Sequence, residues 1–349
     1  MNFHPLKISK LIRLTQDAVE IQFAIPSELS SKFVFSAGQY INIQIEIDGK
    51  KENRSYSICS SERSNDFIAI GVKQIDNGKV STFLNKHVQE NYTVMVSEPM
   101  GNFLLKNSQA AQVFFAGGSG ITPILSMIDS LLHTTAQNVY LILSNKNEAS
   151  TMFYKTLQSF SSQFSTRFEW KNVMTQNGDS RIDIQAAKSF INTIPDFSKS
   201  QFYACGPNGV INALEDALVA LNVSKDQFSR EYFTAKDAED MESASVAKGN
   251  EVPLEKGQKA KVEIRFEGRN YQFECGFNEK IIDAAIDAGA EPPYSCMVAA
   301  CCTCRAMVKN GSVEMLDKDS LSQKEIEKGY VLSCQALPRT QEVFLNFDE

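Results

Sequence analysis

The sequence predicts a multidomain chain: an antiparallel β-barrel, then a parallel α/β domain, then a small α+β domain. Three observations lead to this fold class. The chain has 349 residues, which is enough for two to three domains. Before Ala110 the sequence consists mostly of short strand-like runs, and after it strands alternate with helices. A polar stretch without aromatic residues then separates a third block of structure.

The first predicted domain, residues 1–108, is the barrel. Its strands are apolar and β-branched runs bounded by polar or turn residues. They are expected at Val19–Ile25, Tyr40–Ile47, Phe67–Val72 and Tyr92–Val96. Many short strands in a segment of this length favour a small antiparallel barrel.

The second predicted domain, residues 109–234, alternates strands with helices, which indicates a parallel sheet. Strands are expected at Gln112–Ala116, Val139–Leu143 and Phe202–Cys205. Helices are expected at Pro123–Leu132, Thr151–Phe160 and Val210–Leu221.

Residues 235–258 are predicted to form a flexible linker, because they are acidic, rich in small residues and unable to bury apolar surface. An exposed helix over Asp237–Val246 is the alternative. The third domain, residues 259–349, is a compact α+β unit. It is expected to consist of a hairpin, a helix and a cysteine-bearing loop. The strands of the hairpin are expected at Lys261–Phe266 and Tyr271–Cys275, and the helix at Glu279–Ala288.

Composition excludes several classes of protein. A hydrophobic fraction of 43% and a charged fraction of 22% are typical of a globular protein. No apolar run reaches the ~18–20 residues that span a membrane, and the first residues lack the apolar core of a signal peptide, so we expect a cytoplasmic protein. Basic and acidic residues balance over residues 1–234, so the net charge of −7 lies in residues 235–349. No basic patch indicates nucleic-acid binding.

The cysteines suggest a metal centre. Of eight cysteines, four follow the pattern C-x4-C-x2-C with a distant fourth member: Cys296, Cys301, Cys304 and Cys334. This spacing is typical of plant-type 2Fe-2S clusters, whereas structural zinc sites usually show two paired knuckles. The three histidines lie far from these cysteines, which disfavours a Rieske centre. Cys59, Cys275 and Cys302 are expected to be packing residues, and zinc remains the alternative metal.

The segments PPYSCMVAACCTCRAMVKNGSVEM and EIEKGYVLSCQA resemble the plant-type ferredoxin family across residues 259–349. The resemblance implies a β-grasp-like fold with the four cysteines as cluster ligands. One position departs from the family, which usually has glycine where this chain has Ala299. If that residue is left-handed, an alanine there costs roughly 1–2 kcal/mol.

Two segments before Ala110 carry groups that suit a phosphate and an aromatic ring. Arg54-Ser55-Tyr56-Ser57 offers a cation, a ring for stacking and hydroxyl groups. It resembles the R-x-Y-S flavin motif of the ferredoxin–NADP reductase superfamily, which implies pyrophosphate binding by Arg54, stacking by Tyr56 and a place for Ser57 near the reactive N5.

A second segment resembles the same superfamily's G-x-x-S motif, which implies FAD rather than FMN. Gly78, Val80 and Ser81 would meet the pyrophosphate, and the preceding Val72 and Lys73 would line the flavin ring. The alternative for Gly78 is an ordinary turn glycine.

The segment Gly117–Pro123 follows a predicted strand and opens a helix, a context that suits phosphate binding. It lacks the Lys-Ser/Thr pair of a P-loop, which disfavours nucleotide hydrolysis. It resembles the GGxGxTP nicotinamide motif of the superfamily, which implies coenzyme contacts from Gly118 and Gly120. Thr122 could also reach the flavin.

Two later segments match the superfamily as well. Cys205-Gly206-Pro207 resembles its C-G-P motif, and Glu231-Tyr232-Phe233 resembles its E-x-F ending. The resemblance implies that Ser57, Cys205 and Glu231 lie near the reacting flavin and nicotinamide, and that Phe233 covers the flavin. The alternatives are a buried cysteine at a strand end and an aromatic residue in a final core strand.

The coenzyme's 2′ group is expected to meet the end of the second parallel strand. Ser144 and Lys146 suit the 2′-phosphate of NADPH, whereas Glu148 could favour the ribose hydroxyls of NADH. The charge of the strand end favours NADPH, and NADH stays open.

This order of domains resembles the reductase components of multicomponent oxygenases, including that of the phenylacetyl-CoA epoxidase system. The resemblance implies hydride transfer from NAD(P)H to FAD, single-electron transfer to the 2Fe-2S cluster and delivery to a partner oxygenase. The partner could also be a ring-hydroxylating dioxygenase, a demethylase or a desaturase. A non-enzymatic redox-sensing module is the alternative from another class.

Overall fold

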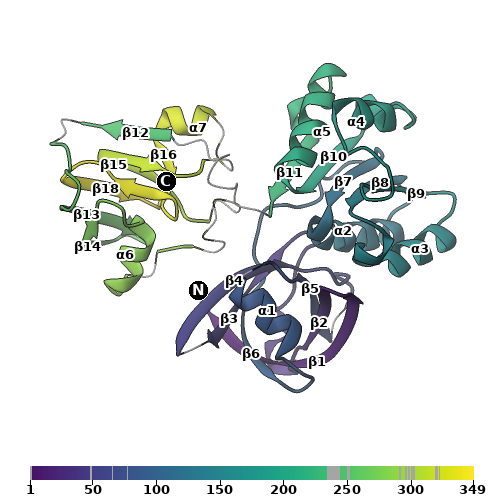
Figure 1. Ribbon diagram of the computed structural model, residues 1–349, viewed down its shortest axis with the longest axis horizontal. Helices are drawn as coiled ribbons and strands as arrows, with labels where there is room; N and C mark the ends of the chain where they lie inside the picture. The colour runs from purple at the N-terminus through teal and green to yellow at the C-terminus, as the bar shows by residue number, and fades with distance from the viewer. Residues whose placement is uncertain are drawn as a thin grey trace. The chain divides into compact units, whose positions relative to one another are not determined.

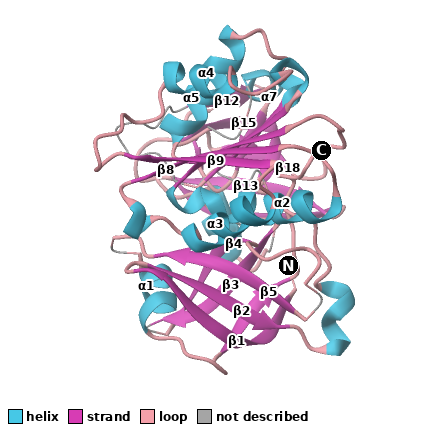
Figure 2. Cartoon of the chain, turned by 90° about the vertical axis from the view of Figure 1, so that its right-hand side faces the viewer, coloured by secondary structure: helices cyan, strands magenta, loops and turns pink. Residues whose placement is uncertain are grey.

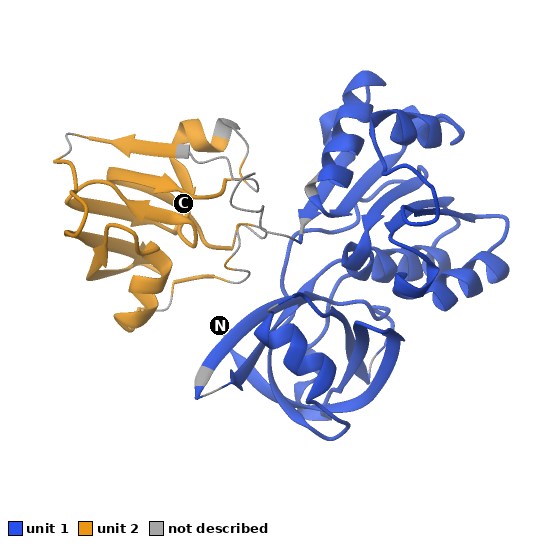
Figure 3. Cartoon of the chain, in the orientation of Figure 1, with its two compact units in different colours: residues 1–233 blue, residues 234–349 orange. Residues whose placement is uncertain are grey.

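The computed structural model describes residues 2–47, 49–64, 66–76, 78–233, 244–249, 252–290, 292–294, 297, 299, 303–318, 321 and 323–349. The chain divides into two compact units, Met1–Phe233 and Thr234–Glu349, which Figure 3 colours separately. We call them unit 1 and unit 2 and treat each by itself.

The first half of unit 1 is an antiparallel barrel sheet with the strand order β4-β3-β6-β1-β2-β5 (Figure 1). Alternate residues of each strand fill its interior, so Ile21, Ile43 and Val96 are fully buried. One helix packs against the sheet. The elements are β1 (Phe3–Thr15), β2 (Ala18–Ala24), β3 (Tyr40–Ile47), β4 (Lys50–Ser57), β5 (Phe67–Lys73), α1 (Lys79–Lys86) and β6 (Thr93–Ser97).

The second half of unit 1 is a parallel sheet with the order β11-β10-β7-β8-β9. Helices α2 and α3 cover one face, and α4 and α5 cover the other (Figures 1 and 2). Every residue of β7 is buried, as expected for a central strand covered on both faces. The elements are β7 (Gln112–Gly117), α2 (Ile121–Thr134), β8 (Val139–Asn145), α3 (Tyr154–Gln163), β9 (Phe168–Met174), α4 (Ile184–Ile191), β10 (Gln201–Gly206), α5 (Asn208–Ala220) and β11 (Phe228–Tyr232).

The barrel and the parallel sheet share one apolar core cluster within unit 1. Small barrel residues, including Ala18 and Ala69, pack there with the side chains of α2. A Cβ added to Gly71 of β5 would lie 2.7 Å from the Thr122 methyl group. Glu62 accepts a 2.8 Å hydrogen bond from the Ala37 amide and also bonds the Ser130 hydroxyl on α2. The two sheets are therefore held together by close packing and by a shared carboxylate.

Unit 2 contains a mixed sheet with the order β12-β15-β18-β13-β14, and β16 and β17 also pair with β15. The predicted hairpin is confirmed: β13 and β14 pair antiparallel from Lys259↔Gly276 to Phe266↔Arg269. The elements are β12 (Ala244–Lys248), β13 (Lys259–Phe266), β14 (Arg269–Gly276), α6 (Ile281–Asp287), β15 (Arg305–Met315), α7 (Gln323–Lys328), β16 (Tyr330–Leu332), β17 (Ala336–Pro338) and β18 (Glu342–Asn346).

Part of the predicted linker belongs to this sheet. Ala244–Lys248 forms β12, which pairs antiparallel with β15 from Ala244↔Met315 to Lys248↔Gly311. Val246 and Leu254 are each only 5% exposed. The ladder of backbone hydrogen bonds orders a segment whose composition alone predicted a coil or an exposed helix. Residues 234–243 lie outside the described residues.

The described helices include none that is both long enough and apolar enough to cross a membrane.

Candidate functional site

The arginine–tyrosine motif lies on β4, which pairs with β3 at one end of the barrel sheet. Arg54 is exposed, Tyr56 packs partly buried against the barrel core, and Ser57 is buried. Ser55 Oγ donates a 2.7 Å hydrogen bond to Oδ1 of the buried Asn42. Burial raises the pKa of the Tyr56 phenol, which therefore stays neutral. The motif thus presents a cation beside a neutral aromatic ring, which suits a phosphate joined to a planar ring.

Glu52 belongs to this site, although no sequence motif pointed to it. Its carboxylate lies 3.4 Å from Arg54 Nη1 and 3.5 Å from Lys79 Nζ. Glu52 and Arg54 are two residues apart on one strand, so their side chains share a face of the sheet. That spacing is the only signal that could have revealed it. The Glu52 carboxylate therefore lies close to one cation from each of the two predicted flavin motifs.

Gly78 precedes α1 and is required by a close approach rather than by a positive φ. A Cβ there would lie 2.6 Å from Ser81 Oγ. The Ser81 hydroxyl accepts a 3.1 Å hydrogen bond from the Ile75 amide and donates a 3.2 Å bond to the Gly78 carbonyl. Val80 is 1% exposed and anchors the helix in the barrel core. Helix α1 begins directly after this turn, and the first N–H groups of a helix can meet an anion.

Val72 and Lys73 end β5, beside α1. Val72 is fully buried in the barrel core, and its carbonyl accepts a 3.2 Å hydrogen bond from Asn85 Nδ2. Lys73 Nζ lies 3.7 Å from Asp17 Oδ2. The Val72 side chain therefore packs into the barrel core, whereas Lys73 keeps a charged group near the strand end.

The two glycine turns of the parallel sheet meet backbone to backbone at the carboxyl ends of β7 and β10. A Cβ on Gly120 would lie 2.2 Å from the Cys205 carbonyl oxygen, and one on Gly206 would lie 2.8 Å from the Gly117 amide nitrogen. Gly118 has φ 53° and open space where a side chain would stand. The structure thus brings together two motifs that are far apart in the sequence and leaves a cradle at Gly118 that a dinucleotide can occupy.

Helix α2 begins at this junction. Thr122 is 1% exposed, and its hydroxyl donates a 3.0 Å hydrogen bond to the Ser119 carbonyl. Its methyl group packs over Gly71 of the barrel, so Thr122 stands between the two sheets of unit 1.

Cys205 ends β10 as a fully buried residue in the core cluster shared by the two sheets. Burial, and then the nearby Glu231 carboxylate, raise the pKa of the Cys205 thiol well above its ordinary value. The two residues are partners in the parallel pairing of β10 and β11. The thiol is therefore neutral and is not a nucleophile. Phe233 follows β11 and packs, partly buried, against the same cluster, as the alternative of a final core strand expects, and its place over the flavin stays a prediction.

The end of β8 carries the residues expected near the coenzyme's 2′ group. Ser144 is half-buried and Lys146 is exposed. Asn147 caps the turn that follows, where its side chain accepts a 3.0 Å hydrogen bond from the Ser150 amide. Burial, and then the nearby Glu148 carboxylate, raise the pKa of the Tyr154 phenol. Glu148 therefore lies close to a neighbouring phenol.

Two of the four predicted cluster ligands, Cys304 and Cys334, lie within the described residues, and both are buried. The backbone amide and the hydroxyl of Ser333 donate hydrogen bonds of 3.1 and 3.0 Å to the Cys304 carbonyl. This pair of hydrogen bonds ties the segment of the third ligand to the segment of the fourth. Buried thiols fixed in this way suit a thiolate-bound cluster.

The described part of the chain contains no group of three or more potential metal ligands. Cys296, Cys301 and Cys302 lie outside it. In the same loop, Met297 and Ala299 have φ values of 60° and 57°. Ala299 is therefore left-handed, the condition under which its departure from glycine carries a cost.

The other described cysteines fit the packing role predicted for them. Cys59 is 5% exposed in the core shared by the two sheets of unit 1. Cys275 is fully buried, and its thiol donates a 3.3 Å hydrogen bond to the Glu279 carbonyl. Burial, followed by Glu279 and Asp283, raises the pKa of Cys275 to about 12.

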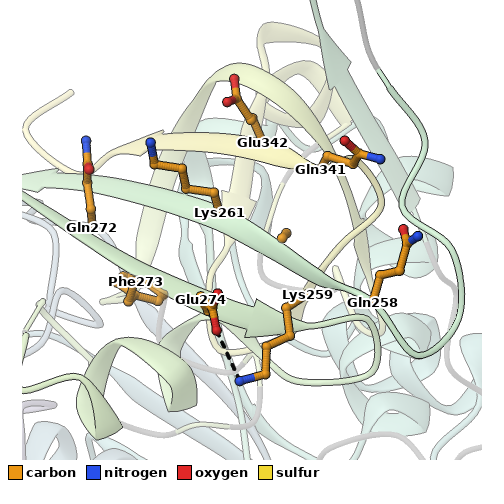
Figure 4. Close-up of a pocket in the computed structure, with 9 residues that line it drawn as sticks. Gln258, Lys259, Lys261, Gln272, Phe273, Glu274, Gln341 and Glu342 are labelled. Atoms are coloured by element: carbon orange, nitrogen blue, oxygen red, sulfur yellow. Dashed lines mark hydrogen bonds and ion pairs between the residues drawn. The ribbon is translucent and has the colours of Figure 1, made fainter.

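A hollow on the outer face of β13, β14 and β18 of unit 2 is lined by exposed polar side chains (Figure 4). Lys261, Gln272 and Glu342 stand on the sheet there, and Lys259 Nζ lies 3.2 Å from Glu274 Oε2. The mixture of charges favours neither an anion nor a cation, so this hollow offers no chemistry that the proposed sites lack.

Three family models match the chain. The oxidoreductase FAD-binding domain matches residues 5–104, the oxidoreductase NAD-binding domain matches residues 114–216, and the 2Fe-2S iron-sulfur cluster binding domain matches residues 264–339. The cofactors expected from the sequence, FAD, a nicotinamide dinucleotide and a 2Fe-2S cluster, are thereby confirmed.

Relatives match over almost the whole chain. A component of 1,2-phenylacetyl-CoA epoxidase from Escherichia coli (strain K12) is 32% identical over 99% of this chain and 98% of its own length. The ferredoxin reductase component of 3-ketosteroid-9-alpha-monooxygenase from Mycobacterium tuberculosis H37Rv is 26% identical over 99% of this chain and 96% of its own. Among solved structures, phthalate dioxygenase reductase has a TM-score of 0.67 at 20% identity, covering 99% of this chain and 98% of its own, and so shares the fold.

Proposed function

Because the chain belongs to the family of NAD(P)H-dependent flavin oxidoreductases that carry a 2Fe-2S domain, we propose that it is the reductase component of an oxygenase system. Its electron acceptor in this proposal is a partner oxygenase. Phenylacetyl-CoA epoxidase is our first candidate, on the strength of the relative that matches end to end. A ring-hydroxylating dioxygenase, a demethylase or a desaturase is the alternative partner.

The proposed flavin site joins both barrel motifs. Arg54 binds the pyrophosphate, Tyr56 stacks on the ring system, and Ser55 and Ser57 hold the strand end beside it. The helix start formed by Gly78, Val80 and Ser81 supplies backbone N–H groups to the pyrophosphate, and Lys73 lines the polar edge of the flavin ring. The neutral phenol of Tyr56 and the paired cations on Glu52 support this assignment.

The observation that carries the proposal is the contact between the Gly120 turn and the Cys205–Gly206 turn. It unites a helix start, a cradle without side chains and a neutral thiol at one edge of the sheet. We propose that Gly118, Gly120, Thr122, Gly206 and Pro207 position the coenzyme there. Cys205, Glu231 and Phe233 would shape the neighbouring pocket where the nicotinamide lies.

The proposed cluster ligands are the four cysteines of the sequence motif: Cys296, Cys301, Cys304 and Cys334. When bound, the flavin accepts a hydride and the cluster transfers single electrons, so the protein's task is to bind, orient and tune these groups. A neutral Cys205 suits that task, because a charged thiolate would disturb the reacting ring.

We propose that NADPH is the preferred coenzyme. Lys146 is exposed and available to a 2′-phosphate, and Ser144 stands two residues before it. Glu148, the group that could favour NADH, lies beside the Tyr154 phenol, whose pKa it helps to raise. A charge-assisted contact to phosphate contributes about 1.5–3 kcal/mol, which corresponds to roughly ten- to a hundredfold in affinity.

An anaerobic titration with NADPH and with NADH, followed by absorbance and electron paramagnetic resonance, tests the proposal. We expect flavin bleaching and a 2Fe-2S signal, with tighter binding of NADPH. Lys146→Ala should weaken NADPH binding about tenfold or more and leave NADH binding nearly unchanged. Lys155→Ala, an exposed lysine on α3, is the matched control. Protein that binds neither flavin nor iron after anaerobic reconstitution would refute the proposed function. Equal losses of affinity for NADPH and NADH in Lys146→Ala would refute the proposed preference for NADPH.

The acidic balance of residues 235–349 supports docking to a basic surface of the acceptor. The rate of acceptor reduction should then fall as ionic strength rises. For the domains we propose boundaries at residues 1–108 and 109–234, and a third domain that extends the expected range 259–349 to include β12, so that the linker is limited to the residues before Ala244. We also propose a cytoplasmic location, since thiolate-bound clusters suit a reducing compartment.

A further inference from the structure

Gln335 is a buried polar side chain beside the proposed cluster, and no motif assigns it a role. It follows Cys334 directly, in the turn between β16 and β17, and is only 3% exposed. Its backbone is fixed on both sides, since its amide donates to the Leu332 carbonyl and its own carbonyl accepts from the Leu316 amide, each at 2.9 Å. A buried amide is costly unless its polar atoms find partners.

The partners of this amide are parts of the cluster loop. Gln335 Nε2 donates a 2.9 Å hydrogen bond to the Met297 carbonyl. The same nitrogen lies 3.8 Å from Cys334 Sγ, within hydrogen-bond reach of sulfur. Met297 is left-handed with φ 60°, so the backbone there departs from an ordinary path where its carbonyl meets the glutamine. One side-chain nitrogen therefore joins the loop of the first ligand to the sulfur of the fourth.

We propose that Gln335 is a positioning residue of the 2Fe-2S centre that also raises its reduction potential. Hydrogen bonds to the ligand sulfurs are one of the protein's means of setting the potential of such clusters. A donor stabilises negative charge on sulfur, and more so after the cluster has gained an electron. The bond to Met297 keeps the donor aimed at Cys334. This inference rests on the proposed binding of the cluster by Cys304 and Cys334.

The test is potentiometric titration of the full-length holoenzyme carrying Gln335→Met, which keeps the length of the side chain and removes the donor. We expect the equilibrium constant for cluster reduction to fall three- to tenfold, a lowering of about 28 to 59 mV for one electron. The FAD potential should stay unchanged, and so should the visible circular dichroism of the cluster. Gln341→Met, the same change at an exposed glutamine of unit 2, is the matched control.

A second variant keeps the proposal testable in case the Gln335→Met protein does not retain the cluster. Gln335→Asn keeps the amide but shortens its reach by one methylene, and it should lower the potential in part. A wild-type potential in either loaded variant would overturn the proposal, and so would loss of iron from both, which would leave only a structural role. If the wild-type protein itself holds no iron, the proposed function fails. If it holds iron and the variants titrate alike, only this inference fails.

Discussion

Replacing Gly120 with alanine should force apart the two turns of the proposed coenzyme site. Gly120 has φ −61° and ψ −8°, so alanine adopts its backbone without strain. The added Cβ, however, would lie 2.2 Å from the Cys205 carbonyl oxygen and 2.4 Å from the carbonyl carbon. Cβ contacts below 3.0 Å essentially never occur, so one turn must retreat by roughly 1 Å.

The size of the destabilisation follows from the kind of atoms that the new Cβ would meet. Because the opposing atoms are backbone atoms at the end of β10, no flexible side chain can yield. Overpacking of this kind costs about 1–3 kcal/mol in the free energy of unfolding. A displacement of about 1 Å in a positioning element reduces a reaction rate on the order of a hundredfold. We therefore expect both a lower melting temperature and a much slower hydride transfer from NADPH to FAD.

Stopped-flow bleaching of the flavin under anaerobic conditions measures the rate, and calorimetry measures the stability. Gly209→Ala in α5 is the matched control, since its added Cβ would meet nothing within 4 Å. That change should preserve the rate and stabilise the helix by up to about 1 kcal/mol. A Gly120→Ala protein with wild-type hydride transfer would show that the two turns do not have to touch for catalysis.

Three further predictions concern charge, strain and pH. Lys79→Ala should weaken FAD binding about two- to fivefold, as expected for the loss of an exposed cation. Lys86→Ala, at the other end of α1, should leave FAD binding unchanged. Equal affinity of both variants for FAD would show that Lys79 does not contribute to flavin binding. Ala299→Gly should change the free energy of unfolding of the loaded protein by less than about 1 kcal/mol in a denaturant titration. The ~1–2 kcal/mol of released strain is offset by the loss of a buried methyl group, ~0.8 kcal/mol, and by a more flexible unfolded chain. A gain in stability above about 2 kcal/mol would contradict this balance. The pKa of Cys275 is raised to about 12 in the folded state, so the stability that its protonated thiol contributes is complete below the ordinary thiol pKa and lost as pH rises from about 9 to 12. Cys275→Ala should therefore flatten the decline in stability over that range, and an unchanged slope would assign the decline to other groups.

Local patterns predicted most of the elements, because each strand or helix is specified by residues close together in the chain. The expected strand Tyr40–Ile47 coincides with β3, and the expected strand Phe202–Cys205 is extended by one residue at each end in β10. Helix boundaries moved by a few residues, as at α3, which begins at Tyr154, directly after the left-handed Phe153, rather than at Thr151. The segment at β12 was missed because an edge strand can be held by backbone hydrogen bonds while Val246 alone is buried among residues 245–248.

Contacts between distant segments were beyond the reach of such patterns. Nothing around Gly120 in the sequence shows that its missing Cβ makes room for the Cys205 carbonyl. The same holds for the approach of Lys79 to the Glu52 carboxylate, and for Gln335, whose amide joins Met297 to Cys334. Motifs identify residues that touch a ligand, whereas the residues that hold those motifs in place are set by tertiary packing.

Ala299 shows where the two kinds of information meet. The spacing of the cysteines predicts a cluster loop, and comparison with the ferredoxin pattern indicates that an alanine replaces the usual glycine, but neither determines the backbone angle. The structure places Ala299 at φ 57° with 2% of its surface exposed. Ala299 therefore keeps a backbone angle that glycine would permit, and the buried methyl group recovers about 0.8 kcal/mol of the roughly 1–2 kcal/mol that the left-handed angle costs. An alanine at this position is thus compatible with an intact cluster loop because burial offsets much of the strain, which a larger, β-branched residue could not do without overpacking.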